Sequence, residues 1–289
     1  MYEMKPLFQQ RMQALLPNSE DFAQFNKIIH TPPKNFIRCN TLKVSPSSLL
    51  ARLQKKWQVS QPFPNYPEIM LIQNALLPGE LGNAIEHVLG YYYIQEISSM
   101  LSAIALSPQP DEFILDLCAS PGSKSTQIAS YMNNKGTLLA NDLKLDRIKI
   151  LSANLERCGV TNSIVSRNDA ISLCSKLSKA NIKFDKILLD APCSGEGTLR
   201  SSPKTFLMWN LKVIQKLSRL QKKFIVFALK CLKKGGTLVY STCTHAPEEN
   251  ESVVSFALKN FPVKIEPITI PLKSRPGIIK WNSEAFHPD

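Results

Sequence analysis

From about residue 112 onward, short apolar runs alternate with amphipathic stretches of helical spacing. This alternation predicts repeated strand–helix–strand units, in which the strands pair in parallel and the helices cover the sheet. We therefore predict an α/β fold built on a parallel sheet. The expected strands are Phe113 to Leu117, Thr137 to Asn141, Ser163 to Val165, Phe184 to Asp190 and Thr237 to Thr242.

A long amphipathic helix is predicted after the fourth strand. Apolar residues recur every three or four positions from Leu211 to Cys231, with Lys and Arg between them. This spacing is typical of a helix that lies on the surface of a domain. We expect the helix to end at Gly235-Gly236, because glycine is the common residue after a helix C-terminus.

The first 110 residues have a different pattern, which predicts a small α+β domain over residues 1–110 ahead of the sheet domain over residues 111–289. The expected elements are helices at Pro6 to Leu16 and Asp21 to Ile29, a strand at Phe36 to Leu42, a helix at Ser47 to Lys56, a Pro-rich stretch from Gln61 to Pro67, and Tyr91 to Glu96 leading into a linking helix.

The charge of the chain is strongly positive. There are 35 Lys and Arg residues against 23 Asp and Glu residues, which gives a net charge of +12. Such a balance indicates a polyanionic partner, nucleic acid first, although a basic surface without a partner is the alternative. The candidate phosphate contacts are Arg38, Lys43, Arg52, Lys55, Lys56, Arg200 and Lys204, and the candidate base-stacking or core aromatics are Phe36, Trp57 and Tyr66.

Several classes of protein are disfavoured by what the sequence lacks. No run approaches the roughly 18 apolar residues of a membrane span, and the segment from Met1 to Pro6 lacks the features of a secretory signal. The seven cysteines do not suggest a disulfide framework, and the absence of CxxC and HExxH patterns predicts no metal site. We expect a cytoplasmic protein without membrane association, acting as a monomer.

A candidate cofactor loop follows the first strand of the predicted sheet. The strand ends at Asp116, a turn contains Pro121-Gly122, and a helix begins near Lys124. This arrangement places backbone N–H groups and a helix N-terminus at the carboxyl edge of the sheet, where open α/β sheets bind ligands. The GxGxxG and P-loop patterns are absent, which disfavours a dinucleotide or a bare phosphate group.

Acidic residues also stand at the ends of the next two predicted strands. Asp142 could accept hydrogen bonds from ribose hydroxyls, and Asp169 could reach an adenine edge. Taken singly, each is more simply explained as a helix cap or a turn former. Three acids, with Asp116, at successive strand ends favour an adenosine cofactor.

Two cysteines end separate strand-like runs, in Asp190-Ala191-Pro192-Cys193 and in Ser241-Thr242-Cys243. Free cysteine packs as a small apolar residue, so two inert buried thiols are the alternative to two reactive ones. Pro192 and the turn-forming residues Ser194 to Gly197 are unusual in the middle of a packed strand, which favours reactive thiols in one active site.

At these residues the chain resembles the Sun-type (NOL/NOP/Sun) RNA cytosine-C5 methyltransferases of archaea and bacteria, which use S-adenosylmethionine. The resemblance covers roughly residues 35 to 258, and the paired PC and TC motifs make it specific. The matching segments are Arg38 to Lys43, Asp116 to Lys124, Asn141-Asp142 with Arg147 and Asn154, Asn168 to Ala170, Asp190 to Gly197, Tyr240 to Thr244 and Glu248 to Glu251.

The resemblance implies a Rossmann-like methyltransferase sheet with a small RRM-like N-terminal domain. It also implies that the Cys243 thiolate attacks cytosine C6, that Cys193 assists product release, that Asp190 holds the cytosine, and that Lys124 lies close to the reacting base. The residues alone leave the reverse order of the two thiols open. The implied S-adenosylmethionine contacts are Cys118, Ala119, Ser120, Pro121, Gly122, Ser123, Lys124, Asp142, Arg147, Asp169 and Asp190.

The implied activity is transfer of a methyl group to a cytidine of tRNA, giving 5-methylcytosine, with ribosomal RNA as the alternative substrate. A non-catalytic RNA-binding factor is a hypothesis of another class. The loop departs from the family pattern at Ser120, Ser123 and Ser125, for which we expect at most a weaker cofactor affinity. The family closes its sheet with a strand carrying Gly-Phe-Phe, whereas this sequence stops at Asp289, so we expect a missing last strand or a shortened chain.

Overall fold

The computed structural model describes residues 4–288. The expectations for the first residues of the chain and for Asp289 therefore fall partly outside the described residues. The carboxyl-terminal sheet has five parallel strands in the order β7-β6-β5-β8-β9, which confirms the predicted α/β class. Its strands are β5 (Phe113–Asp116), β6 (Thr137–Asp142), β7 (Ser163–Arg167), β8 (Phe184–Asp190) and β9 (Leu232–Ser241).

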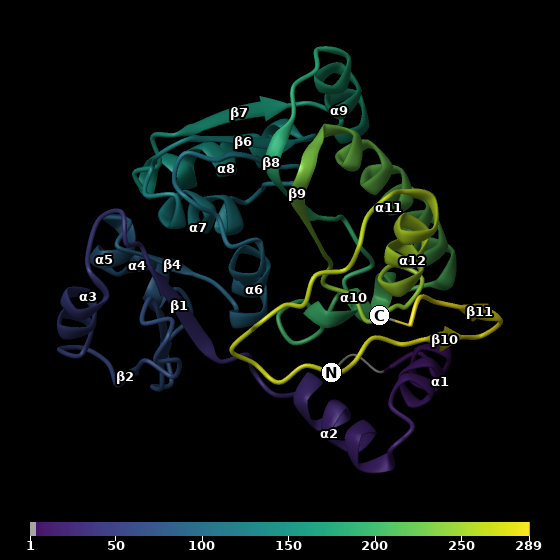
Figure 1. The fold of residues 1–289 in the computed structure, drawn as a ribbon. Helices are drawn as coiled ribbons and strands as arrows, with labels where there is room; N and C mark the ends of the chain where they lie inside the picture. Colours follow the sequence, from purple (N-terminus) through teal and green to yellow (C-terminus); the bar gives the residue numbers. More distant parts are fainter. Residues whose placement is uncertain (1–3, 289) are drawn as a thin grey trace.

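Helices cover both faces of this sheet because alternate strand residues point to opposite sides. Ile114, Leu138 and Leu188 pack against α6 (Ile97–Leu106) and α7 (Ser123–Tyr131), with α8 (Leu145–Arg157) beside them. Leu115 and Leu189 pack on the other face, against α9 (Ala170–Lys179), α11 (Leu211–Cys231) and α12 (Glu251–Asn260). Figure 1 shows this three-layered body.

A second, four-stranded antiparallel sheet lies ahead of the parallel sheet in the chain, in the order β2-β3-β1-β4. Its core contains Ile37, Leu49, Met70 and Tyr92, all essentially fully buried. The elements are β1 (Asn35–Cys39), α3 (Pro46–Leu53), β2 (Val59–Ser60), β3 (Ile69–Ile72), α4 (Glu80–Asn83), α5 (Ile85–Val88) and β4 (Tyr92–Ile94). The predicted lead-in to the linking helix therefore contains a strand, β4.

The first two helices, α1 (Pro6–Leu15) and α2 (Ser19–Ile29), pack against the segment that follows Cys193. Phe8 lies edge-on to Phe206 and Trp209, with ring centroids 5.8 and 5.2 Å apart. The short elements here are η1 (Glu196–Thr198), α10 (Thr205–Met208), β10 (Lys280–Trp281) and β11 (Glu284–Ala285), the last two forming a hairpin beside α1 (Figure 1).

The structure corrects the predicted end of the long helix. Helix α11 ends at Cys231 and β9 begins at Leu232, so Gly235-Gly236 lies inside the strand. Phe184 pairs with Leu232 but Lys186 pairs with Thr237, so two positions of β8 face five of β9. Gly235 takes a φ of +76° in this bulge, a conformation that glycine adopts without strain.

The predicted phosphate contact at Arg38 is wrong, because its side chain is buried at 1% exposure. Its guanidinium donates to the Ser123 carbonyl at 2.7 Å, to Thr126 Oγ1 at 2.8 Å and to Gln95. Lys43 likewise donates to the carbonyls of Leu89 and Arg157. Arg38 of β1 therefore contacts the start of α7, and Lys43, in the turn after β1, contacts the end of α8.

We expect Arg38→Ala to lower the free energy of unfolding by about 3 kcal/mol or more, because buried acceptors lose their charged donor and a cavity forms. Urea titration measures this change. Arg52→Ala is the matched control, since Arg52 is half exposed and 3.8 Å from Glu86, and it should cost less than about 1 kcal/mol. Equal losses in the two variants would contradict the anchoring role of Arg38.

In the part of the chain that the structure describes, no helix has the length and apolar character needed to cross a membrane. Strand β9 is at the edge of its sheet, and between α12 and residue 288 the chain forms the β10–β11 hairpin without adding a strand there.

Candidate active site

The candidate site lies at the carboxyl edge of the parallel sheet, where β5 and β8 are neighbours. The chain runs from β5 to β6 and β7 on one side and then returns to β8 on the other, which makes this edge a topological switch point. Asp190 at the end of β8 pairs in register with Ser241 at the end of β9. The segments that carry Cys193 and Cys243 therefore leave the sheet side by side.

The two thiols meet in space although 50 residues separate them. Cys193 Sγ and Cys243 Sγ are 3.0 Å apart, and the Cys243 backbone N–H donates to Cys193 Sγ at 3.2 Å. Cys243 is exposed and Cys193 is partly exposed, so neither is a core thiol. The other five cysteines are also free, and none of the seven forms a disulfide.

An ion pair between α7 and the carboxyl end of β8 lies at the same edge of the sheet. Lys124 Nζ is 2.9 Å from Asp190 Oδ2 and also donates to Ser99 Oγ at 2.9 Å. Ser241 Oγ donates to Asp190 Oδ1 at 2.8 Å. Lys124 is brought here because it lies in the first turn of α7, directly after the loop that follows β5.

The surroundings of the thiols make them chemically different. A hydrogen bond from the Cys193 thiol lowers the pKa of Cys243, and the nearby Lys124 ammonium lowers it further, against the opposing effects of burial and Asp190. The same hydrogen bond raises the pKa of Cys193, and burial adds to this rise. The arrangement thus favours a thiolate on Cys243 and a neutral thiol on Cys193.

We expect Lys124→Met to raise the pKa of Cys243, because the variant removes the cation that favours the thiolate. Only the thiolate is alkylated readily, so the pH profile of iodoacetamide labelling at Cys243 should move to higher pH. Peptide mass spectrometry follows this residue separately from the others. Lys233→Met, which breaks the exposed pair with Asp185 at 2.7 Å, is the control and should leave the profile unchanged. An unchanged profile in Lys124→Met would contradict the prediction.

The loop between β5 and α7 is held tightly. Gly122 has a φ of +103°, and a Cβ there would lie 3.2 Å from Leu151 Cδ1, so this position suits glycine. Asp116 is 1% exposed and accepts from Ser125 Oγ at 2.6 Å. Burial raises the pKa of Asp116 to about 7. Its Oδ1 atom is buried with no hydrogen-bond partner among residues 4–288.

A second polar group surrounds Asp142 at the end of β6. Asp142 Oδ2 accepts from the Ser120 backbone N–H at 3.3 Å and is 3.4 Å from Arg147 Nη2. Arg147 also donates to the Ser120 carbonyl at 2.6 Å. The Asn154 amide holds the Pro121 carbonyl at 2.9 Å, so α8 supports the loop from one side.

Asp169 acts as a helix cap, one of the two roles considered for it. Its carboxylate accepts from the Ser172 backbone N–H at 2.9 Å at the start of α9.

The first residues of the loop after β5 are also held in place. Ala119 donates its backbone N–H to the Asn141 carbonyl. Burial raises the pKa of the neighbouring Cys118, which favours a neutral thiol there.

Sequence reasoning missed several residues that organise this site. Ser99 contacts Lys124 from α6, and Glu196 and Glu249 hydrogen-bond to residues next to the two thiols. The acidic run from Glu248 to Glu251 was a visible signal, but it gave no indication of a buried role. Ser99 stands in a plain apolar helix that offers no signal.

Comparison with known families decides what this arrangement belongs to. Residues 103–282 match the family model described as 16S rRNA methyltransferase RsmB/F. Residues 4–97 match the model for the N-terminal domain of 16S rRNA methyltransferase RsmF. The chain belongs to the RsmB/F methyltransferase family. This membership confirms the resemblance drawn from the PC and TC motifs.

Two curated relatives of this RsmB/F chain have names that state an activity. It is 40% identical over 268 residues to a tRNA (cytosine(49)-C(5))-methyltransferase of Pyrococcus abyssi, covering 92% of this chain and 84% of the relative. It is 42% identical over 247 residues to a ribosomal RNA small subunit methyltransferase F of Vibrio cholerae, covering 84% of this chain and 51% of the relative. The chain thus spans about half the length of the bacterial relatives.

A solved structure supports the same fold and the cofactor. NSun6 from Pyrococcus horikoshii, solved with the S-adenosylmethionine analogue SFG, superposes with a TM-score of 0.83 at 27% identity. The match covers 94% of this chain and 91% of the other. The RsmB/F chain is an S-adenosylmethionine-dependent methyltransferase with a Rossmann-like sheet.

Proposed function

We propose that this enzyme methylates C5 of a cytidine in RNA, using S-adenosylmethionine and a covalent bond between Cys243 and cytosine C6. The observation that carries the proposal is the pair of thiols 3.0 Å apart beside the Lys124–Asp190 ion pair. The cytosine-C5 activity named for the Pyrococcus abyssi relative supports the reaction, and the basic charge of +12 supports a nucleic-acid substrate.

The chemistry explains why a thiolate is needed. Cytosine C5 is a weak nucleophile, and addition of the Cys243 thiolate to C6 makes C5 electron-rich enough to accept a methyl group. A base then removes the C5 proton, the electron pair re-forms the C5–C6 double bond, and the thiolate of Cys243 leaves. We propose that Cys193 assists this release, because its sulfur touches that of Cys243 and a neutral thiol there can exchange a proton.

Asp190 and Lys124 are proposed to hold the base. An Asp190 carboxylate oxygen can accept from the exocyclic amine of cytosine or share a proton with N3, since 32% of the side chain is exposed. Lys124 supplies positive charge beside Asp190 and favours the Cys243 thiolate. Both residues therefore act on substrate and nucleophile together.

The residues at the sheet edge fit the cofactor, which when bound supplies an electrophilic methyl group on a sulfonium centre. Asp116 Oδ1 is a buried acceptor without a partner among the described residues, and Asp142 makes only long contacts of 3.3 to 3.4 Å. Such acceptors can take hydrogen bonds from ribose hydroxyls and an ammonium group. We propose Cys118 to Lys124, Asp142, Arg147, Asp169 and Asp190 as the cofactor contacts.

We propose tRNA as the substrate, with ribosomal RNA as the alternative that the name of the family model suggests. A base stacked in a stem cannot present C6 to a thiol, so the target must be unpaired or extruded. We further propose that the protein is a cytoplasmic monomer that neither associates with membranes nor binds a metal ion. The seven free thiols are consistent with a reducing compartment.

Transfer of labelled methyl from S-adenosylmethionine to separately purified tRNA and ribosomal RNA tests the function. We expect labelled 5-methylcytidine in the nucleosides of the tRNA pool. Label only in the ribosomal pool would move the substrate to rRNA. RNA binding without label in either pool, with S-adenosylmethionine bound, would contradict the enzymatic proposal and favour a binding factor.

A further inference from the structure

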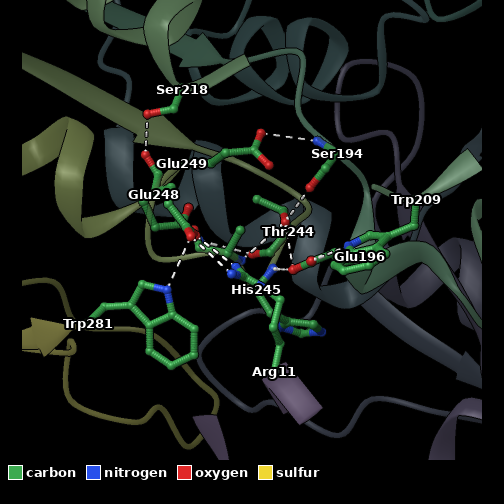
Figure 2. Close-up of polar contacts among 12 residues, drawn as sticks. Arg11, Ser194, Glu196, Trp209, Ser218, Thr244, His245, Glu248, Glu249 and Trp281 are labelled. Atoms are coloured by element: carbon green, nitrogen blue, oxygen red, sulfur yellow. Dashed lines mark hydrogen bonds and ion pairs between the residues drawn. The ribbon is translucent and has the colours of Figure 1, made fainter. Parts of the chain in front are cut away.

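A buried polar cluster joins the two loops that carry Cys193 and Cys243 (Figure 2). It contains two carboxylates, Glu196 and Glu249, in residues that are 1% and 0% exposed. Removing a carboxylate from water is costly unless hydrogen bonds compensate, so each must be held in place by its neighbours. The hydrogen-bond partners of Glu196 and Glu249 therefore indicate what each carboxylate holds in place.

Glu196 binds the loop of the other thiol. It comes three residues after Cys193, and its Oε2 atom accepts from Thr244 Oγ1 at 3.0 Å and from the His245 backbone N–H at 3.1 Å. Its Oε1 atom accepts from the Trp209 indole N–H at 2.6 Å. Thr244 and His245 directly follow Cys243, so Glu196 holds the TC loop from the PC loop.

Glu249 makes the reverse connection. It comes six residues after Cys243, and its Oε2 atom accepts from the Ser194 backbone N–H at 3.1 Å and from Gln221 Nε2 at 2.8 Å. Gln221 also donates to the Pro192 carbonyl at 2.9 Å. Residues on both sides of Cys193 are thus tied to a side chain downstream of the other thiol.

The two loops also contact each other directly and are closely packed. Ser194 Oγ and Thr244 Oγ1, each next to one of the cysteines, are 2.7 Å apart. The Gly197 backbone N–H donates to the Cys243 carbonyl at 2.8 Å, and a Cβ on Gly197 would lie 3.0 Å from that oxygen. Small movements of either loop must therefore change the distance between the thiols.

We propose that Glu196 and Glu249 are reciprocal positioning residues, each holding the loop of the opposite thiol, so that Cys193 Sγ stays in contact with Cys243 Sγ. The proposal rests on the proposed roles of the two thiols. The two carboxylates accept hydrogen bonds from residues that neighbour the cysteines and not from the sulfurs themselves. Loss of the hydrogen bonds of Glu196 and Glu249, which we call the clamp, should still allow Cys243 to attack the base. Release of the product should then be slow, because Cys193 is no longer held in contact with Cys243. The resulting enzyme should turn over slowly and retain RNA covalently.

The hydrogen bonds predict which isosteric variants succeed. Both hydrogen bonds to the Glu249 carboxylate use Oε2, and Oε1 has no partner in the described residues, so Glu249→Gln can keep an acceptor oxygen where it is needed. Glu196 accepts through both oxygens, so Glu196→Gln must turn an N–H donor toward another donor. Glu249→Gln should thus retain what Glu249→Ala and Glu196→Gln lose.

Oxidative cross-linking of the full chain, without RNA or cofactor, tests the proposal. Diamide takes up the two protons and two electrons released when the Cys193 and Cys243 thiols join, and mass spectrometry identifies the linked peptides. We expect wild type and Glu249→Gln to cross-link at the same rate. Glu249→Ala and Glu196→Gln should cross-link at least about tenfold more slowly, since misplacing reacting groups by about 1 Å can slow a reaction about a hundredfold.

Glu248→Ala is the matched control, because Glu248 is the chain neighbour of Glu249 but points to Arg11, at 2.8 Å, and to Trp281 (Figure 2). Its cross-linking rate should equal that of wild type even where its melting temperature falls. If Glu249→Ala does not fold, Glu196→Gln and Thr244→Val, which removes the contact with Ser194, decide the question. Wild-type cross-linking in folded Glu196→Gln and Glu249→Ala or Thr244→Val would overturn the proposal.

Methyl transfer then separates this inference from the function on which it rests. In the slow cross-linking variants, kcat should fall about tenfold or more while KM for S-adenosylmethionine stays the same, and an adduct with RNA should appear. Unchanged kcat in those variants would also overturn the positioning role. Absence of methyl transfer by wild type, with cross-linking as expected, would overturn the proposed function alone.

Discussion

Cys243→Ser is expected to lower kcat for methyl transfer by about 10⁴-fold or more, to background in most assays. The hydroxyl of serine stays protonated near neutral pH, so it cannot add to cytosine C6 as the thiolate does. Loss of a nucleophile has effects of this order in other enzymes. Label transfer from S-adenosylmethionine to RNA at saturating substrate measures the change.

RNA and cofactor binding should survive this substitution, because Cys243 is exposed and the change is small in volume. The dissociation constants of the variant for RNA and for S-adenosylmethionine therefore serve as controls. Cys174→Ser is the matched cysteine control, since Cys174 is a buried core residue of α9 to which we assign no role in the site. Methyl transfer by Cys243→Ser within tenfold of wild type would refute Cys243 as the nucleophile.

Cys193→Ala is expected to trap a covalent protein–RNA adduct and to lower turnover about 100-fold or more. Attack forms the bond between Cys243 and cytosine C6 without a chemical change at Cys193. Release follows removal of the C5 proton, and this is the step that we propose Cys193 assists. The pKa of Cys243 should rise in this variant, because the hydrogen bond from Cys193 is its largest lowering influence. Denaturing gel electrophoresis with labelled RNA detects the adduct.

The double variant Cys193→Ala with Cys243→Ser provides the control, because it removes the bond that forms the adduct and should run as free protein. The opposite pattern has an equally clear meaning. An adduct that accumulates in Cys243→Ala and is absent from Cys193→Ala would exchange the roles of the two thiols.

The parallel sheet was predictable because its strands are short apolar runs that end at polar residues. Predicted ends at Asp190 and near Asp116 and Asp142 agree with β8, β5 and β6. Because parallel strands share one carboxyl edge, the positions of Asp190, Lys124 and the two cysteines near one another followed from the topology. The alternation of the pattern carried this information.

Other features depend on contacts that no local pattern records. An arginine is usually a surface cation, yet Arg38 is buried, and its guanidinium donates to the Ser123 carbonyl and the Thr126 hydroxyl of α7. Gly235-Gly236 has the signature of a helix end, but the pairing of β8 with β9 places it in a bulge. The hydrogen bonds of Glu196 and Glu249 could not be predicted, because they depend on how two loops about 50 residues apart in the sequence are aligned with each other.

The hydrogen bonds that Arg38, Asn40 and Lys43 donate to α7 and to the end of α8 have a thermodynamic consequence for the boundary expected near residue 110. Asn40 donates to the Cys158 carbonyl at 2.7 Å, and Lys43 donates to that of Arg157 at 2.7 Å. Separating the two sheets would remove the hydrogen bonds that Asn40 and Lys43 donate to these carbonyls and that Arg38 donates to the Ser123 carbonyl. The two sheets should therefore melt together in one cooperative transition, so that a ligand bound to either one stabilises both.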